Sequence, residues 1–168
     1  MLENNEIKFS KTSIPDVISF ELNPKQDERG FTIPLLPTFL SAHVLISINP
    51  RIGTLRGLHL QYEQEKIVSV IRGRIFDVVL DMRKDSSTYL KHAVFDILPG
   101  KNSIYIPSSC AHGFQTMEED TEVIYQLSKP YNPNLESGVS WDDPKLGIKW
   151  PVVDSRIISD KDSSWRKL

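Results

Sequence analysis

The stretch KIVSVIRGRIFDVVLD, residues 66–81, carries the clearest structural signal in the chain. It contains two runs of β-branched and other apolar residues, each of strand length and too short for a typical globular helix. Arg72 and Gly73 separate the two runs, and glycine readily adopts the positive φ that a tight turn requires. The stretch therefore predicts a β-hairpin that turns at Arg72-Gly73.

Similar short runs occur on both sides of this stretch. Eight glycines and eleven prolines are spread along the chain and mark frequent turns. Before the C-terminal tail, no segment longer than two turns has the 3.6-residue period of an amphipathic helix. Many short strands with frequent turns predict an all-β sandwich or barrel. The runs that we expect to form strands are 43–49, 66–71, 74–81, 103–106 and 121–127.

Length and charge limit the class of protein. The 168 residues suit one domain, which we expect to span residues 1–168. A formal charge of -2 argues against nucleic acid or an anionic membrane as a partner. No apolar run approaches the roughly 18 residues that span a bilayer, and the polar, acidic start is unlike a signal peptide. Cys110 is the only cysteine, which excludes an internal disulfide framework. We expect a cytoplasmic protein.

The C-terminal end differs in composition from the rest of the chain. Residues 152–168 are polar and rich in serine, which by itself predicts a loosely packed tail. We expect Trp141 and Trp150, just before it, to pack the C-terminal segment onto the barrel.

Two of the four histidines lie in unusual surroundings. His59 stands in GTLRGLHLQ (53–61) and His112 in IPSSCAHGF (106–114), each near the end of a strand-like run. Either one alone would be interpreted as structural, but together they predict a shared pocket. The spacing from Gly53 to His59 is half of a cupin signature, in which Gln61 stands at the position of the usual second histidine. The sequence is thus similar to a cupin-type jelly roll with an incomplete set of metal ligands.

A metal centre is accordingly not expected. A divalent site usually has three or more nitrogen or carboxylate ligands. Only His59, His112 and Glu65 are candidate ligands in this sequence, which is barely enough for such a site.

Seven segments, taken in order, closely resemble the dTDP-4-dehydrorhamnose 3,5-epimerase family. The combination of RGLH-Q, AHGF and DP-L-I-WP is specific, whereas any one of these motifs alone would be weak. The resemblance implies a jelly roll with N-terminal strands and a short C-terminal tail packed on the barrel. It also implies a homodimer with exchanged N-terminal strands, no metal or other cofactor, and a nucleotide-linked 4-keto-6-deoxyhexose as substrate. The segments are DERG (27–30), GTLRGLHLQ (53–61), EKIVSVIRGRIFDVVLDMRKDS (65–86), IPSSCAHGF (106–114), VIYQLSKPYNP (123–133), WDDPKLGIKWP (141–151) and SDKD (159–162).

The resemblance also implies roles for individual residues. His59 matches the catalytic base, Asp162 its carboxylate partner and Tyr125 the acid. Lys66 matches the lysine near the keto oxygen, although the loop that precedes it is shorter than is usual in the family. The remaining matches are substrate contacts: Arg29 and Arg56 for the diphosphate, and Gln61, His112 and Tyr131 elsewhere in the pocket.

These residue types suit epimerisation next to a ketone. The base should titrate near the working pH, as an unperturbed histidine does. A carboxylate on the far ring nitrogen fixes the tautomer and stabilises the imidazolium. An ammonium stabilises the charge that develops on the ketone oxygen, and a tyrosine that is protonated at neutral pH can return the proton.

The sequence departs from the family pattern in one functional region. This sequence lacks the glutamate of the family motif DxRGxFxE, and Thr32 stands in place of an aromatic residue. His43 and Leu45 stand where glutamine and asparagine are usual, and Pro130 with Tyr131 replaces a pair of tyrosines. Because such positions serve the nucleotide base and the outer sugar contacts, the reaction type is better supported than the nucleotide.

Three other interpretations remain open. The chain is a 3-epimerase or a 5-epimerase restricted to one centre, with the same or another nucleotide. It is a metal-dependent cupin, such as a dioxygenase or isomerase. Or it is a sugar-binding jelly roll without catalytic activity, which would not require a base, a carboxylate, a lysine and a tyrosine together.

Overall fold

The fold is given by a computed structural model that describes residues 7–35 and 42–168. The first six residues of the polar start lie outside this range. The elements are β1 (Ile7–Lys11), β2 (Ile18–Leu22), β3 (Lys25–Asp27), β4 (Gly30–Thr32), β5 (His43–Asn49), β6 (Leu55–Gln61), β7 (Lys66–Arg72), β8 (Ile75–Asp81), β9 (His92–Ile97), β10 (Asn102–Ile106), β11 (Cys110–Thr116), β12 (Thr121–Leu127), η1 (Pro133–Leu135), β13 (Glu136–Gly138) and α1 (Asp160–Ser163).

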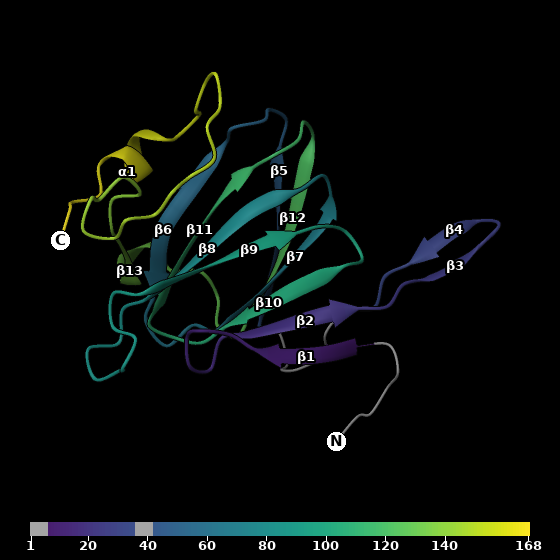
Figure 1. The fold of residues 1–168 in the computed structure, drawn as a ribbon, viewed down its shortest axis with the longest axis horizontal. Coiled ribbons are helices and arrows are strands. Elements are labelled where there is room, and N and C mark those ends of the chain that lie inside the picture. Colours follow the sequence, from purple (N-terminus) through teal and green to yellow (C-terminus); the bar gives the residue numbers. More distant parts are fainter. Residues whose placement is uncertain (1–6, 36–41) are drawn as a thin grey trace.

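Two antiparallel sheets face each other and form a jelly roll (Figure 1). One sheet has the order β1-β2-β10-β7-β12-β5, and the other has the order β13-β6-β11-β8-β9. The prediction of an all-β jelly roll is confirmed, and so is the expectation that N-terminal strands join it, since β1 and β2 extend the first sheet.

The predicted hairpin at Arg72-Gly73 is wrong. Gly73 has a φ of +77° and makes the expected turn, but β7 pairs with β10 and β12 whereas β8 pairs with β11 and β9. The turn therefore carries the chain from one sheet to the other. Both strands are apolar on both faces and central in their sheets, and their neighbours come from distant parts of the sequence. Local sequence identifies the turn but not the pairing.

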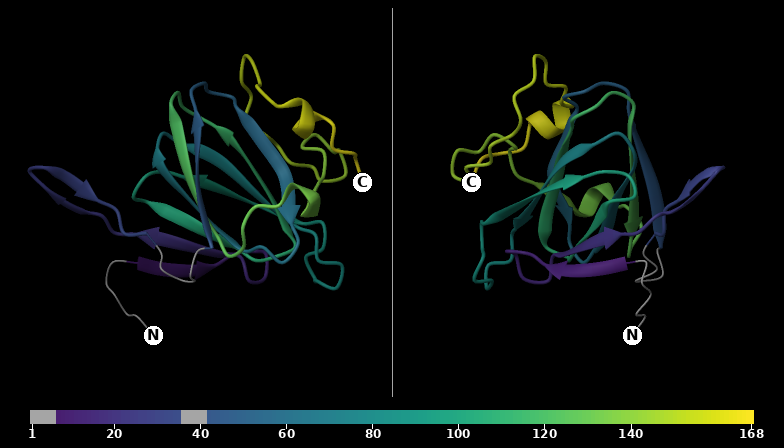
Figure 2. Two further views of the ribbon diagram at one scale, coloured as in Figure 1. Left: turned by 180° about the vertical axis from the view of Figure 1, so that it is seen from behind. Right: turned by 45° about the vertical axis from the view of Figure 1, so that its right-hand side comes forward.

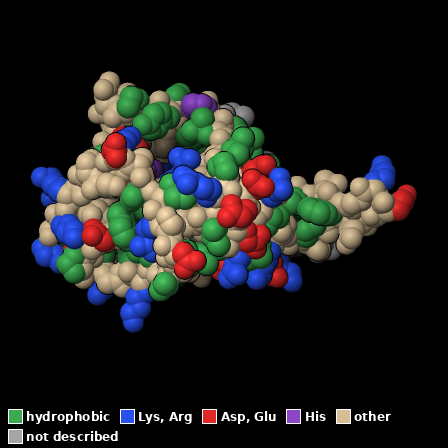
Figure 3. All heavy atoms as spheres, turned by 90° about the horizontal axis from the view of Figure 1, so that it is seen from above, with side chains coloured by type: hydrophobic (Ala, Val, Ile, Leu, Met, Phe, Trp, Pro, Cys, Tyr) green, Lys and Arg blue, Asp and Glu red, His purple; other side chains and the backbone are tan. Residues whose placement is uncertain are grey.

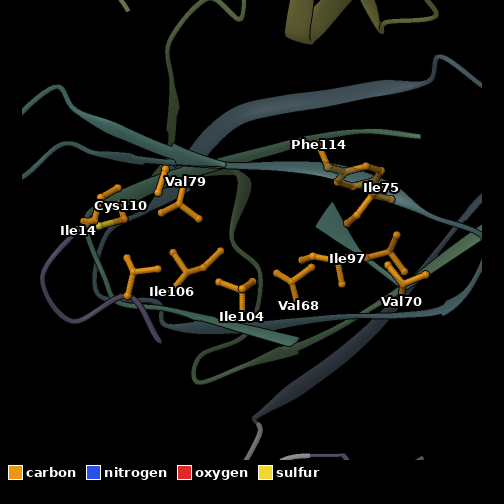
Figure 4. Close-up of a cluster of buried hydrophobic side chains, with 13 residues drawn as sticks. Ile14, Val68, Val70, Ile75, Val79, Ile97, Ile104, Ile106, Cys110 and Phe114 are labelled. Carbon is orange, nitrogen blue, oxygen red and sulfur yellow. The ribbon is translucent and has the colours of Figure 1, made fainter. Parts of the chain in front are cut away.

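The space between the sheets is filled at one end by a hydrophobic core. Strand periodicity directs alternate side chains of both sheets inward. Val68 and Ile104 of the first sheet face Ile75, Val79 and Phe114 of the second (Figure 4). Each of these side chains is almost completely buried. Burial of this kind contributes about 1.5–3 kcal/mol for each large aliphatic or aromatic side chain, which stabilises this end of the barrel.

The C-terminal segment covers the outer face of the second sheet. Leu146, Ile148 and Trp150 pack against Leu58 and other apolar side chains on that face. The indole N–H of Trp150 also donates to the Trp141 carbonyl at 2.8 Å. As expected, these tryptophans help to hold the segment on the barrel.

A short ribbon formed by β3 and β4 projects from the body of the molecule (Figures 1 and 2). Phe31 on this ribbon is 63% exposed. Within residues 7–35 and 42–168, no helix has the length and apolar character needed to cross a membrane.

Candidate active site

The end of the barrel that the core leaves open holds a cavity of about 500 Å³. In the space-filling view of Figure 3, histidine side chains lie beside a hollow in this face of the molecule. Both sheets contribute to the walls, and the segment around α1 closes one side. The lining residues are Leu45, Ile46, Ser47, Ile48, Arg56, His59, Leu60, Gln61, Gln64, Lys66, His112, Phe114, Tyr125, Leu127, Tyr131, Glu136, Ser159, Lys161 and Asp162.

His59 lies on β6 between two carboxylates. Its Nε2 is 3.4 Å from Asp162 Oδ1, and its Nδ1 is 3.8 Å from Glu136 Oε1. Asp162 Oδ2 accepts a hydrogen bond from the Gly57 amide at 2.9 Å. Burial alone would raise the pKa of Asp162, but the contacts with His59 and Gly57 hold it below its ordinary value. An ionised Asp162 favours the proton on Nε2 and leaves the lone pair of Nδ1 as the basic site.

The C-terminal tail brings Asp162 to this position. Ser159 caps α1 by accepting a hydrogen bond from the Asp162 amide, and Leu55 of β6 donates its amide to the Ile157 carbonyl. The Trp165 ring packs directly against Gly138. The tail is therefore packed on the barrel, contrary to what its composition predicts.

Lys66 and Tyr125 approach the cavity from neighbouring strands, β7 and β12. Burial lowers the pKa of Lys66 to about 8, although the charges of Glu136 and Asp77 oppose this shift. Burial raises the pKa of the Tyr125 hydroxyl well above its ordinary value. At neutral pH the site thus presents an ammonium and a protonated phenol to one space.

His112 lies deeper, on β11. Its Nε2 is 2.6 Å from Asp77 Oδ2, and its ring meets that of Tyr125 edge to face with the centroids 6.1 Å apart. Burial lowers the pKa of His112, even though the Asp77 charge acts in the opposite direction.

Arg56 is held at the cavity by a neutral partner. Its Nε donates to Asn49 Oδ1 at 2.9 Å, while the Asn49 amide donates to the carbonyls of Ser47 and Thr121. An amide orients a guanidinium without neutralising its charge, so Arg56 remains suited to an anionic ligand.

Gln61 lines the cavity, but both ends of its side-chain amide are engaged by the chain itself. Nε2 donates to the Pro130 carbonyl at 3.0 Å, and Oε1 accepts from the Asn132 amide at 2.7 Å. Gln61 therefore fixes the segment that carries Tyr131, whose hydroxyl donates to Glu136 at 2.8 Å.

Arg29 is the one residue of the predicted set that lies away from the cavity. It stands on the turn between β3 and β4, its side chain is 83% exposed, and it pairs with Asp27. Glu65, considered as a metal ligand, does not line the cavity either. Among the described residues, no group of three or more His, Cys, Asp or Glu side chains is arranged to hold a metal ion.

Four residues at or beside the site were not singled out from the sequence. Asp77 is marked only by being a carboxylate in the apolar run IFDVVLD, a signal that could have been used. Lys161 stands in the SDKD segment beside Asp162, whereas Asn49 and Glu136 carry no local signal. Glu136 comes close to His59 through the pairing of β13 with β6.

The arrangement can remove and return a proton. A carboxylate-bound imidazole, a buried ammonium and a protonated phenol share one cavity, and an arginine lies at its wall. These groups match proton transfer next to a carbonyl in an anionic ligand.

Comparisons with known proteins identify the family of this chain. The sequence model of the dTDP-4-dehydrorhamnose 3,5-epimerase family matches residues 11–168. A dTDP-4-dehydrorhamnose 3,5-epimerase from Methanothermobacter thermautotrophicus is 38% identical over 97% of this chain and 95% of its own.

Solved structures show the same relationship. The dTDP-6-deoxy-D-glucose-3,5-epimerase from Legionella pneumophila, in complex with dTDP-4-keto-L-rhamnose, has a TM-score of 0.91, 28% identity and coverage of 96% of this chain and 93% of its own. A 3′-monoepimerase from Streptomyces bikiniensis, in complex with dTDP-quinovose, has a TM-score of 0.88, 27% identity and coverage of 93% and 85%. The chain belongs to the dTDP-4-dehydrorhamnose 3,5-epimerase family and is an isomerase.

Proposed function

We propose that this protein converts dTDP-4-dehydro-6-deoxyglucose to dTDP-4-dehydrorhamnose by inverting C3 and C5. The observation that carries the proposal is that His59, with Asp162 at its Nε2, shares one cavity with Lys66 and Tyr125. The relatives' names supply the class of substrate.

The reaction proceeds through enolates. His59 Nδ1 removes the proton from the carbon next to the C4 ketone, and the C–H electron pair becomes the enolate. The Lys66 ammonium stabilises the charge on the ketone oxygen, to which a preorganised donor contributes about 3–4 kcal/mol. Tyr125 then donates its proton to the opposite face of the same carbon, which inverts the centre. Solvent reprotonates Tyr125, and His59 loses its proton before the second centre reacts.

The nucleotide part of the substrate requires positive charge at the diphosphate. Arg56 supplies one guanidinium from the cavity wall. We assign the second to Arg29 of another copy, since the projecting ribbon holds it away from its own cavity. The proposed assembly is a homodimer.

The exposed edge strand β5 supports the dimer. Its Val44, Ile46 and Ile48 side chains are each more than half exposed. Apolar edge strands of this kind are normally covered by another chain or element.

We propose that the reaction takes place in the cytoplasm and uses no metal or other cofactor. Lys66 already provides the positive charge at the ketone oxygen that a metal ion would otherwise supply. Dialysis against a strong chelator should therefore leave the rate unchanged, and loss of activity that added metal restores would contradict this part of the proposal.

The experiment that tests the function follows the substrate by proton NMR. Incubation with dTDP-4-dehydro-6-deoxyglucose in heavy water should give the doubly inverted product, with deuterium at both C3 and C5. Recovery of unlabelled substrate would contradict the proposal.

The second candidate function is epimerisation at a single centre. It is favoured by the structural likeness to the 3′-monoepimerase. In the same experiment, this candidate predicts deuterium and inversion at one carbon only.

A further inference from the structure

Asp77 is a buried carboxylate for which the proposed reaction gives no role. It lies on β8 with no exposed surface, and its side chain contacts His112, which lines the cavity. Oδ2 contacts His112 Nε2 at 2.6 Å, and Oδ1 has no hydrogen-bond partner among the described residues.

Such a pair costs stability. Replacement of a buried ion pair by apolar side chains is often neutral or stabilising, whereas an unsatisfied buried oxygen costs about 1–3 kcal/mol. The other inward-facing positions nearby on β8, Ile75 and Val79, are apolar and belong to the core. Packing alone therefore does not account for a carboxylate at position 77.

The pair determines where His112 carries its proton. A carboxylate only accepts hydrogen bonds when ionised, so the ring nitrogen that faces it must hold the hydrogen. That nitrogen is Nε2, which leaves Nδ1 with a lone pair in the neutral ring. His112 lines the cavity, so Nδ1 is the ring nitrogen left to meet a ligand.

We propose that Asp77 is a positioning residue that fixes the tautomer of His112, so that Nδ1 accepts a hydrogen bond from a hydroxyl of the bound sugar. This inference rests on the proposed function for the identity of the ligand, but not for the tautomer. In this arrangement His112 is an acceptor that selects a hydroxyl, and Lys66 is the donor to the ketone oxygen.

The tautomer can be measured without turnover. Nitrogen-15 NMR of the histidine rings in the unliganded protein should place the His112 proton on Nε2. A proton on Nδ1 would overturn the proposal, whatever substrate the enzyme uses. Because this measurement needs no variant and no substrate, its failure is distinct from a failure of the proposed function.

Two substitutions at position 77 separate the orientation of the His112 ring from the charge of the carboxylate. In Asp77→Asn, the side-chain carbonyl can turn toward Nε2, since neither oxygen of Asp77 is otherwise bound. Asp77→Val removes the acceptor and suits a buried strand. We expect Asp77→Val to lose about 10- to 100-fold in kcat/KM while thermal stability is kept, and Asp77→Asn to retain most of the activity. Equal losses in the two variants, or no loss in Asp77→Val, would overturn the proposal.

A double-mutant cycle tests whether Asp77 acts through His112. In a His112→Phe background, Asp77→Val should cost no further activity, whereas an additive loss would contradict the proposal. Asp81→Asn provides a matched control on the same strand. Asp81 is equally buried but binds Arg83, Ser86 and Thr88 away from the cavity, so its replacement should lower stability and leave kcat/KM unchanged.

Discussion

At the scale of single residues, the environment of Lys66 makes the reaction sensitive to alkaline pH. Its pKa of about 8 lies below the ordinary value of 10.5 because the side chain is buried. The ammonium is therefore lost as pH rises through about 8, and kcat/KM should fall tenfold for each further pH unit. Lys66→Met should abolish this alkaline limb and reduce the rate by about 10²- to 10³-fold. A pH–rate profile of both proteins is the measurement.

The lowered pKa of Lys66 affects stability in the opposite direction to activity. Between pH 8 and 10.5 the unfolded chain still protonates this lysine while the folded chain does not, so the Lys66 contribution to stability rises with pH. An alkaline limb that persists in Lys66→Met would show that another group controls the rate.

Asp162 is expected to act on His59 through the position of a proton. Its Oδ2 is already bound to the Gly57 amide, so an asparagine at 162 would place its carbonyl there and turn its N–H toward His59 Nε2. The imidazole would then hold its proton on Nδ1 and could not act as a base. Asp162→Asn should lower kcat by about 10²- to 10⁴-fold with a much smaller change in KM. Steady-state kinetics that show an unchanged kcat would contradict this role.

What the sequence could reveal at this scale was limited to residues with a recognisable motif. His59, Lys66, His112 and Tyr125 stand in motif segments and do share the cavity. The groups that orient them act between strands whose arrangement the local sequence does not specify: Asn49 reaches Arg56 from the opposite sheet, and Asp77 reaches His112 across the β8–β11 pair.

At the scale of elements, the C-terminal segment shows why composition misjudged the tail. Residues 152–168 are held by specific contacts that include a serine cap, a backbone bridge from Ile157 to Thr54 just before β6, and the packing of Trp165 on Gly138. A polar, serine-rich segment can pack well when specific contacts of this kind hold it.

Gly138 should control the position of Asp162. A Cβ at this position would overlap the Trp165 ring, which packs just beyond α1. Gly138→Ala should therefore displace α1 and lower kcat by at least about tenfold, since small misplacements near a reacting centre have large effects. The loss should exceed that expected from the change in melting temperature.

The control for this substitution is Gly147→Ala. No atom lies within 4 Å of an added Cβ there, so the substitution does not touch Trp165. Its cost comes from backbone strain, because φ is +62° at Gly147, whereas Gly138 has no positive φ. Gly147→Ala should cost about 1 kcal/mol of stability and leave kcat unchanged. Equal kinetics for the two variants would show that Trp165 does not hold Asp162 in place.

The β7–β8 connection illustrates what strand patterns can and cannot give. The turn at Gly73 and the bounds of both strands followed closely from the sequence, as did β5 and β12. The pairing did not, because a turn within one sheet and a turn between two sheets require the same local residues.

At the scale of the whole molecule, the expected homodimer can be tested by mixing two inactive proteins. If Arg29 serves the cavity of another copy, the Arg29→Ala and His59→Asn lesions of a mixed dimer both fall in the cavity of the His59→Asn copy, and the other cavity is intact. Refolding the two variants together should give activity well above that of either alone. Activity equal to the average of the separately refolded variants would contradict a trans role for Arg29.

The fold class was predictable at this scale because strand length, turn frequency and the family motifs all agree. The position of Arg29 was not, since it lies on a ribbon that projects from the barrel (Figure 1), and no sequence pattern reveals this projection.

The most direct test of the account is hydrogen exchange from substrate in heavy water, compared among wild type, His59→Asn and Tyr125→Phe. Wild type should incorporate deuterium with inversion. Tyr125→Phe should still exchange hydrogen, but without inversion, because the base remains. His59→Asn should lose exchange by at least about 10²-fold. Exchange at the wild-type rate in His59→Asn would show that another group removes the proton.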